Sequence, residues 1–211
     1  MQRRWIWLLI ALPMVVVIGF FTLVLTTPRS SETRQAQTRV SGEALIGGPF
    51  TLTDETGATV TDADFRGRAM LIYFGYTYCP DVCPFSLQIM AAALDQLTDE
   101  ERAQIQPILI TIDPERDTVE QLAQYVSSPA FPENLTGLTG TPEQIAVAAS
   151  AYRVAYRRSE GEEESDYLVD HTSIIYLMDR QGRFVDVFAH GSDPQSMAAR
   201  LKEFLEEDSA S

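Results

Sequence analysis

The feature that most constrains this chain of 211 residues is an apolar and aromatic run, residues 71–78, that leads directly into Cys-Pro-Asp-Val-Cys-Pro at residues 79–84. A run of β-branched and aromatic residues predicts a buried strand. The residues that follow, 85–97, have the apolar spacing of a helix. Both cysteines of the protein, Cys79 and Cys83, therefore lie at a junction between a strand and a helix.

Strands and helices alternate along the rest of the chain. The sequence predicts a hairpin over residues 50–60, a strand over 105–112, a helix over 118–125, a short strand over 135–138, a helix over 141–151, strand character over 152–156, a hairpin over 173–188 and a last helix from 194 to about 205. This order predicts an α/β fold with a central mixed β-sheet and helices on both faces. A strand that feeds a helix through a cysteine pair narrows the prediction to a thioredoxin-like fold.

The N-terminal segment predicts a membrane anchor, because residues 5–25 carry no charge and are almost entirely apolar. Arg3 and Arg4 precede it, so the positive-inside rule places the N-terminus in the cytoplasm and the rest across the membrane. A cleaved signal peptide is the alternative, although the apolar run is long for one. No transit peptide precedes the run, which favours the bacterial inner membrane, crossed once, with the C-terminal domain in the periplasm.

These features divide the chain into four parts. We expect a transmembrane anchor over residues 1–27, a flexible linker over 28–44, a thioredoxin-like domain over 45–207 and a disordered tail over 208–211. The formal net charge is −14. Such an acidic chain excludes nucleic acid as a partner.

The cysteine spacing is Cys-x-x-x-Cys, one residue longer than the Cys-x-x-Cys of thioredoxin-type redox sites. A proline follows each cysteine, which disfavours helical backbone there, so we expect the helix to begin at Pro84 with Cys83 just outside it. The pair can close as a disulfide or offer two thiolates to one ion. A disulfide that serves only as a staple is a further reading, but a loop of three enclosed residues gives little stabilisation.

The ligand inventory favours copper. Thiolates select copper(I), zinc or iron-sulfur clusters, and the last two need about four ligands. The whole chain offers two cysteines and two histidines, His171 and His190. His171 directly precedes the strand predicted from Ser173, whose start faces the cysteine loop in a thioredoxin-like sheet, so His171 is the candidate third ligand. His190 lies in a loop beyond the hairpin and is interpreted as a surface residue. Residues 167–188 contain no proline, so the cis-proline with which dithiol oxidoreductases grip substrates is missing.

Three segments together resemble the Sco family, also called SenC, of membrane-anchored, thioredoxin-like copper chaperones for cytochrome c oxidase. They are residues 73–84, residues 111–117 (Thr-Ile-Asp-Pro-Glu-Arg-Asp) and residues 170–173 (Asp-His-Thr-Ser). The resemblance spans roughly residues 45–205. It implies that Cys79, Cys83 and His171 bind one copper ion, as Cu(I) or Cu(II), and that Asp113 lies near the site, as an outer group or a contact with the partner.

The same resemblance implies the partners: subunit II of cytochrome c oxidase, which carries the dinuclear CuA centre, and other periplasmic copper chaperones. Two roles fit there. The protein delivers copper to the CuA site, or it acts as a thiol-disulfide reductase that keeps the CuA cysteines reduced. A peroxiredoxin-like redox sensor is a third and weaker hypothesis, since peroxiredoxins share the fold. Peroxidase activity needs a thiolate of low pKa that forms a sulfenic acid.

Overall fold

A computed structural model describes residues 46–159 and 167–209. No helix within these two ranges is long and apolar enough to cross a bilayer. The anchor expected over residues 1–27 and the linker expected over 28–44 lie outside the described residues.

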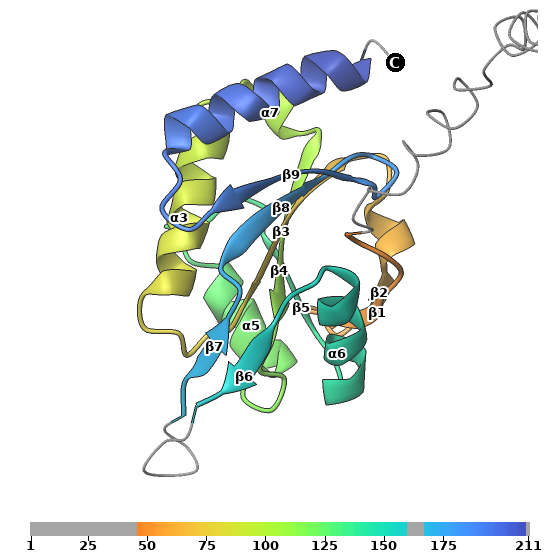
Figure 1. Cartoon of the computed structure of the whole chain (residues 1–211), viewed down its shortest axis with the longest axis vertical. Coiled ribbons are helices and arrows are strands. Elements are labelled where there is room, and N and C mark those ends of the chain that lie inside the picture. Colours follow the sequence, from red (N-terminus) through yellow and green to blue (C-terminus); the bar gives the residue numbers. More distant parts are fainter. Residues whose placement is uncertain (1–45, 160–166, 210–211) are drawn as a thin grey trace, which may run out of the picture. The chain divides into compact units, whose positions relative to one another are not determined.

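The centre of the fold is a seven-stranded mixed sheet in the order β2-β1-β5-β4-β3-β8-β9 (Figure 1). Its strands are β1 (Thr51–Asp54), β2 (Thr59–Thr61), β3 (Ala69–Gly75), β4 (Ile105–Thr111), β5 (Thr136–Thr139), β8 (Ile174–Met178) and β9 (Phe184–Ala189). β3, β4 and β5 are parallel, whereas β8 runs antiparallel to β3. The end of β3 and the start of β8 therefore lie at the same edge, as a thioredoxin-like fold requires.

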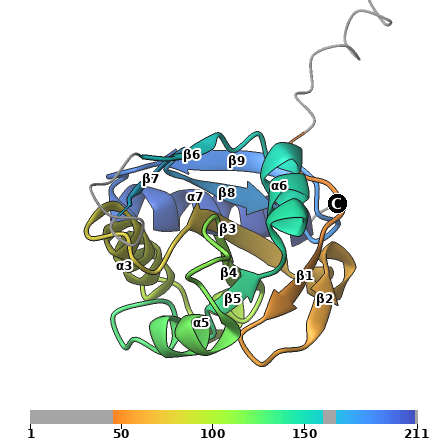
Figure 2. The same ribbon diagram turned by 90° about the horizontal axis from the view of Figure 1, so that it is seen from below.

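Helices cover both faces of this sheet. They are α3 (Val82–Leu94), α4 (Asp99–Arg102), α5 (Val119–Val126), α6 (Pro142–Ala151) and α7 (Pro194–Ser209), with a short 3-10 helix η1 (Asp62–Phe65). Successive strand residues point to opposite faces. Tyr73 packs toward Cys83 of α3, and its neighbour Phe74 packs on Tyr152 at the end of α6. α3 and α6 therefore lie on opposite faces, with α7 beside α3 (Figure 2).

Burial explains why β3 was readable from sequence. All seven of its residues are buried, because helices cover both of its faces. Strands of this kind read as continuous apolar runs. Side chains cap two of the predicted helices, since Thr118 accepts a hydrogen bond from the Gln121 amide at the start of α5 and Thr141 accepts one from the Gln144 amide at α6.

Four expectations about local structure were wrong. α3 begins at Val82, two residues before Pro84, so Cys83 lies inside the helix. The strand expected over residues 152–156 is β6 (Tyr156–Arg158), because Arg153 has a positive φ of 58° that ends α6 with a turn. α7 extends to Ser209, beyond residue 205 and into the tail expected from 208, where Asp208 forms an ion pair with Arg180.

The fourth difference is a missed element, β7 (Val169–His171), which pairs antiparallel with β6 in a separate two-stranded sheet. In this sheet His171 is the register partner of Tyr156. His171 is thus the last residue of a strand and not a residue of the loop before β8. This ribbon holds the histidine over the cysteine loop.

Candidate metal centre

Three separate elements bring the two cysteines and His171 together. Cys79 lies in the loop after β3, Cys83 in the first turn of α3 and His171 at the end of β7. One ligand atom from each lies within 4.8 Å of the others. Cys83 Sγ is 3.5 Å from His171 Nε2, and both cysteines are free thiols. Two sulfurs and one imidazole nitrogen therefore surround a single point.

The early start of α3 shapes this geometry. Pro84 is the third residue of the helix, where its missing N–H removes no hydrogen bond, because the first turn's amides have no partner within the helix. The proline therefore does not delay the helix. The amide of Cys83 instead donates to Cys79 Sγ at 3.3 Å. A helix N-terminus thus faces the sulfur of Cys79.

The orientation of His171 suits metal binding. Its Nδ1 lies 3.1 Å from the carbonyl oxygen of Thr172. A carbonyl can only accept, so Nδ1 carries the proton and Nε2 presents its lone pair toward the thiols. The rings of Tyr73 and Tyr76 each approach the imidazole edge-on, with centroids 6.0 Å away. Backbone and aromatic contacts together fix this ring, as outer-shell groups do at metal sites.

The two thiols differ in environment and in acidity. Cys83 is buried, whereas Cys79 is partly exposed and lines an open hollow of ≈ 260 Å³ together with His171. The hydrogen bond from the Cys83 thiol lowers the pKa of Cys79 to about 3, against the raising effect of burial and with further lowering by the backbone amides of Cys83 and Asp81. The same bond, together with burial, raises the pKa of Cys83. Cys79 is therefore the accessible thiolate, and Cys83 is a buried thiol behind it.

Gly75 makes room for the buried thiol. A Cβ atom at this position would lie 2.8 Å from Cε1 of Tyr73 and 3.0 Å from Sγ of Cys83. Any side chain there would displace the ring or the sulfur. From sequence alone Gly75 is only a glycine at a strand end. Its role becomes visible once the structure shows that the side chains of Tyr73 and Cys83 point toward it.

Asp117 holds the loop that carries Cys79, and sequence reasoning missed this role. Its carboxylate is fully buried and accepts hydrogen bonds from the Thr77 amide, the Thr77 hydroxyl and the Thr111 hydroxyl. Burial raises the pKa of Asp117, against the lowering effect of these hydrogen bonds. Asp117 is the last residue of the Asp-Pro-Glu-Arg-Asp motif at residues 113–117, so this motif is the feature of the sequence that could have pointed to its role.

Asp113, the residue of this motif chosen from the resemblance, does not reach the ligands. It is 4% exposed, and its carboxylate accepts from Arg116 Nε at 2.5 Å and from the Tyr167 hydroxyl at 2.6 Å. The Arg116 guanidinium lies 5.8 Å from the ring centroid of Tyr76, which in turn contacts His171. This burial favours an outer, structural role for Asp113 over contact with a partner.

His190 stays apart from the three candidate ligands. Its Nδ1 lies 3.2 Å from the hydroxyl of Ser86, and its ring packs against Phe85 with centroids 5.4 Å apart. The metal-ligand group found among the described residues contains His171 and not His190.

The family follows from comparison with known sequences. The SCO1/SenC family model matches residues 38–206, which is most of the chain. The chain belongs to the SCO1/SenC family. One relative in this family is a mitochondrial SCO1 homologue of Arabidopsis thaliana. It is 44% identical to this chain over 157 residues, which cover 74% of this chain and 46% of the homologue.

Other SCO1/SenC relatives match over more of their length. SenC of Rhodobacter capsulatus is 41% identical over 195 residues, which cover 91% of this chain and 86% of SenC. The human mitochondrial SCO1 homologue is 42% identical over 174 residues, covering 82% of this chain and 57% of the homologue. The chain thus spans about half the length of the mitochondrial SCO1 relatives and most of the bacterial one.

Solved structures of SCO1/SenC proteins share this fold. ScoI of Arabidopsis thaliana, described with copper bound, matches with a TM-score of 0.70 at 42% identity, over 76% of this chain and 99% of that one. ScoI of Bradyrhizobium japonicum, also described with copper bound, matches with a TM-score of 0.68 at 44% identity, over 75% of this chain and 99% of that one. The family and the mixed α/β fold predicted from sequence are confirmed.

Proposed function

We propose that this SCO1/SenC protein is a copper metallochaperone that binds one copper ion through Cys79, Cys83 and His171. The observation that carries the proposal is the convergence of two sulfurs and one imidazole nitrogen within 4.8 Å. Thiolates and imidazole are ligands that copper favours, and the set is too small for a structural zinc site or an iron-sulfur cluster. The copper-bound ScoI structures of two relatives support the same cargo.

The site is accessible from one side, which suits a protein that must release its cargo. Cys79 and His171 line the open hollow, while Cys83 lies beneath. An acceptor can therefore approach the metal past Cys79. We propose that the acceptor is the CuA domain of cytochrome c oxidase subunit II, and that other periplasmic copper chaperones supply the ion. The protein would be held at the inner membrane by residues 1–27, with the domain in the periplasm; confinement to that surface raises the effective concentration of donor and acceptor.

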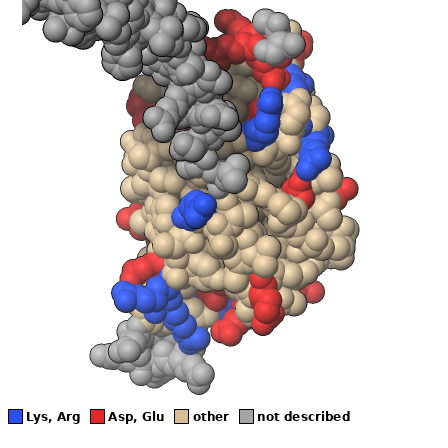
Figure 3. Space-filling view, turned by 45° about the vertical axis from the view of Figure 1, so that its right-hand side comes forward, with Lys and Arg blue, Asp and Glu red and all other residues tan. Residues whose placement is uncertain are grey.

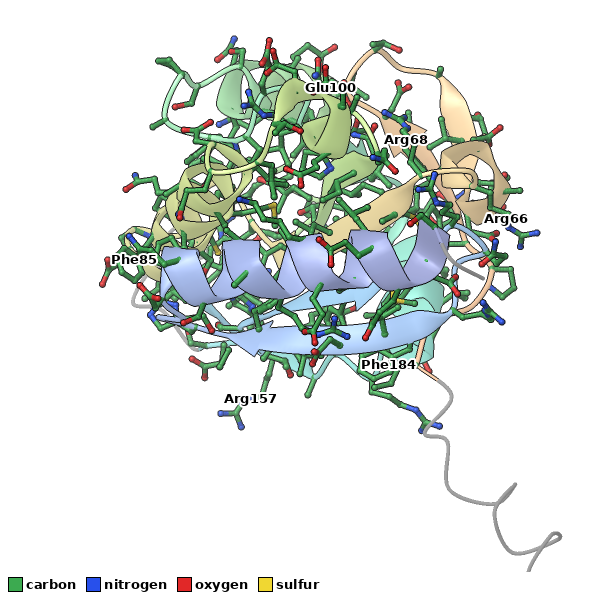
Figure 4. The ribbon with its side chains drawn as sticks, turned by 90° about the horizontal axis from the view of Figure 1, so that it is seen from above. Arg66, Arg68, Phe85, Glu100, Arg157 and Phe184 are labelled. Atoms are coloured by element: carbon green, nitrogen blue, oxygen red, sulfur yellow. The ribbon has the colours of Figure 1, made fainter. Side chains whose placement is uncertain are left out.

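The surroundings of the hollow support docking of a protein. Tyr78, Phe85 and Leu168 flank the cysteine loop and are 53%, 45% and 49% exposed, so three large side chains with apolar surface face solvent around the loop. Phe85 projects outward from the first turns of α3 (Figure 4). Acidic and basic side chains are interspersed over the face in Figure 3, which has no continuous basic surface of the kind that nucleic acid requires.

The asymmetry of the thiols favours a second candidate function, reduction of the CuA cysteines. In that reaction the Cys79 thiolate attacks one sulfur of the partner's disulfide and releases the other as a thiolate. Cys83 then loses its proton and attacks Cys79 of the mixed disulfide. The products are the Cys79–Cys83 disulfide and two reduced thiols on the partner, so two electrons pass to the partner. A low pKa at the accessible thiol and a buried resolving thiol are the arrangement that this chemistry needs.

Substitution of His171 separates the two functions. The parent, His171→Ala and the control His190→Ala are reduced and titrated anaerobically with Cu(I), and each is also mixed with an oxidised CuA-domain substrate. Chaperone function predicts one ion per parent chain and per His190→Ala chain, and a large loss of affinity in His171→Ala. Parent-like affinity in His171→Ala would refute the three-ligand site. Disulfide exchange that survives in His171→Ala would show that the cysteines also act as a reductase.

A further inference from the structure

Tyr73 contributes a buried hydroxyl that the metal-free fold does not use. The side chain extends from β3 toward α3 and is 0% exposed. Among the described residues, its hydroxyl has no hydrogen-bond partner. A buried hydroxyl without a partner is destabilising, and phenylalanine would fill the same space without this cost. The hydroxyl therefore has no evident role in folding.

The hydroxyl lies beside the buried thiol. The point where a Gly75 Cβ would be lies 2.8 Å from Tyr73 Cε1, next to the hydroxyl-bearing carbon, and 3.0 Å from Cys83 Sγ. Cys83, Ser86 and Ser173 are the polar side chains around the Tyr73 hydroxyl, and none of them is placed to form a hydrogen bond with it. The two serine hydroxyls donate to backbone carbonyls, Ser86 to Val82 and Ser173 to His171, and the oxygen of each is a neutral acceptor whose strength does not depend on the metal. Cys83 is the neighbour whose strength as an acceptor changes with the state of the site.

That change follows from thiol chemistry. In the metal-free protein Cys83 is a free, buried thiol. A neutral thiol sulfur is a weak acceptor, whereas an ionised acceptor forms hydrogen bonds roughly twice as strong as a neutral one. Once Cys83 is a metal-binding thiolate, its sulfur becomes the acceptor that the Tyr73 hydroxyl lacks.

We propose that Tyr73 is a positioning residue that donates a hydrogen bond to the Cys83 sulfur when Cys83 binds copper as a thiolate. This inference rests on the proposed function. The bond stabilises the thiolate and withdraws electron density from it, which tunes the metal as outer-shell groups do. Its cost is an unsatisfied hydroxyl in the metal-free protein, so the same group that favours copper binding disfavours the empty fold.

The test compares Tyr73→Phe with the parent and with Tyr176→Phe, in the full chain purified in a mild detergent. Tyr176 is a matched control, because it is 1% exposed and packs against Phe74 on the opposite face of the sheet. Thermal unfolding is measured without metal, Cu(I) affinity by competition with a chelator, and the Cu(II)–thiolate charge-transfer band by absorption. For Tyr73→Phe we expect metal-free stability equal to or above that of the parent, Cu(I) affinity lowered about tenfold or more, and a band at longer wavelength. Tyr176→Phe should keep the affinity and the band of the parent.

Two results would overturn the inference while the proposed function stands. One is a Tyr73→Phe protein with the affinity and the band of the parent. The other is a Tyr73→Phe protein that is clearly less stable without metal, which would mean that the hydroxyl is already bonded in the empty fold. Failure of the parent itself to bind copper would instead overturn the proposed function, and this inference with it.

Discussion

The space at Gly75 allows a quantitative test of how the fold positions the site. In Gly75→Ala the new Cβ would lie 2.8 Å from the Tyr73 ring and 3.0 Å from Cys83 Sγ, both closer than normal contact. Overpacking of this kind costs about 1–3 kcal/mol. The φ of Gly75 lies outside the left-handed region, so alanine also restricts the unfolded chain and returns about 0.4–1 kcal/mol. The net loss of stability is therefore at most about 2.6 kcal/mol, or up to about 10 °C in unfolding temperature.

Gly137→Ala is the matched control, because a Cβ there would lie 2.9 Å from Val126 Cγ1 and 3.4 Å from Leu122, under α5 and away from the cysteines. Both variants should unfold at lower temperature in a calorimeter. Only Gly75→Ala should also lose Cu(I) affinity, by about tenfold, because it displaces a ligand or the ring beside it. Equal affinities in the two variants would refute the argument that Gly75 sets the position of the Cys83 sulfur.

Three further predictions test other parts of the site. Asp117→Ala leaves three hydrogen-bond donors without their acceptor and should lower the free energy of unfolding, measured by urea denaturation, by about 2–4 kcal/mol. A change below about 0.5 kcal/mol would contradict the role of Asp117 in holding the loop that carries Cys79. The lowered pKa of Cys79 keeps this residue a thiolate in weak acid. Iodoacetamide at about pH 6 should therefore modify Cys79 of the reduced, metal-free protein and leave Cys83 unmodified, as measured by mass spectrometry. Equal labelling of the two thiols would argue against a difference in their acidity and exposure. Leu168→Asp should keep Cu(I) affinity and slow copper transfer to a CuA domain, whereas Val147→Asp, at a 58% exposed position, should change neither; unchanged transfer in Leu168→Asp would remove Leu168 from the docking surface.

The sheet and most helices were predictable because their signals are local. β3 and β4 are buried along their whole length and therefore read as apolar runs. The helices α5 and α6 begin after threonines that cap them, and a threonine followed by a good first turn is visible in sequence. The position of β8 next to β3, and antiparallel to it, then follows from the thioredoxin-like fold. For this reason a residue just before β8 could be expected near the cysteines at the end of β3.

The ribbon of β6 and β7 could not be predicted in the same way. Each strand has three residues, too few to show a period of two, and Tyr156 pairs with His171, 15 positions later in the sequence. The position of His171 near the cysteine loop was therefore predicted correctly from the sheet edge alone, without the β6–β7 pairing. The sheet edge brings the chain there, and the ribbon then fixes where the imidazole lies.

The start of α3 shows how a correct rule can mislead at a functional site. Proline disfavours helical backbone in the residue before it, which predicted Cys83 outside the helix. The helix instead begins at Val82, since its first turn tolerates proline, and this places Cys83 inside while Cys79 remains in the loop. The two cysteines are four positions apart in sequence, but only Cys83 belongs to the helix, so their side chains do not stack on one helix face. One sulfur receives the hydrogen bonds of a helix start and faces the hollow, and the other is buried beneath it. A metal site that must release its ion and a dithiol that must attack a partner both need this inequality, so the position of the helix start underlies either function.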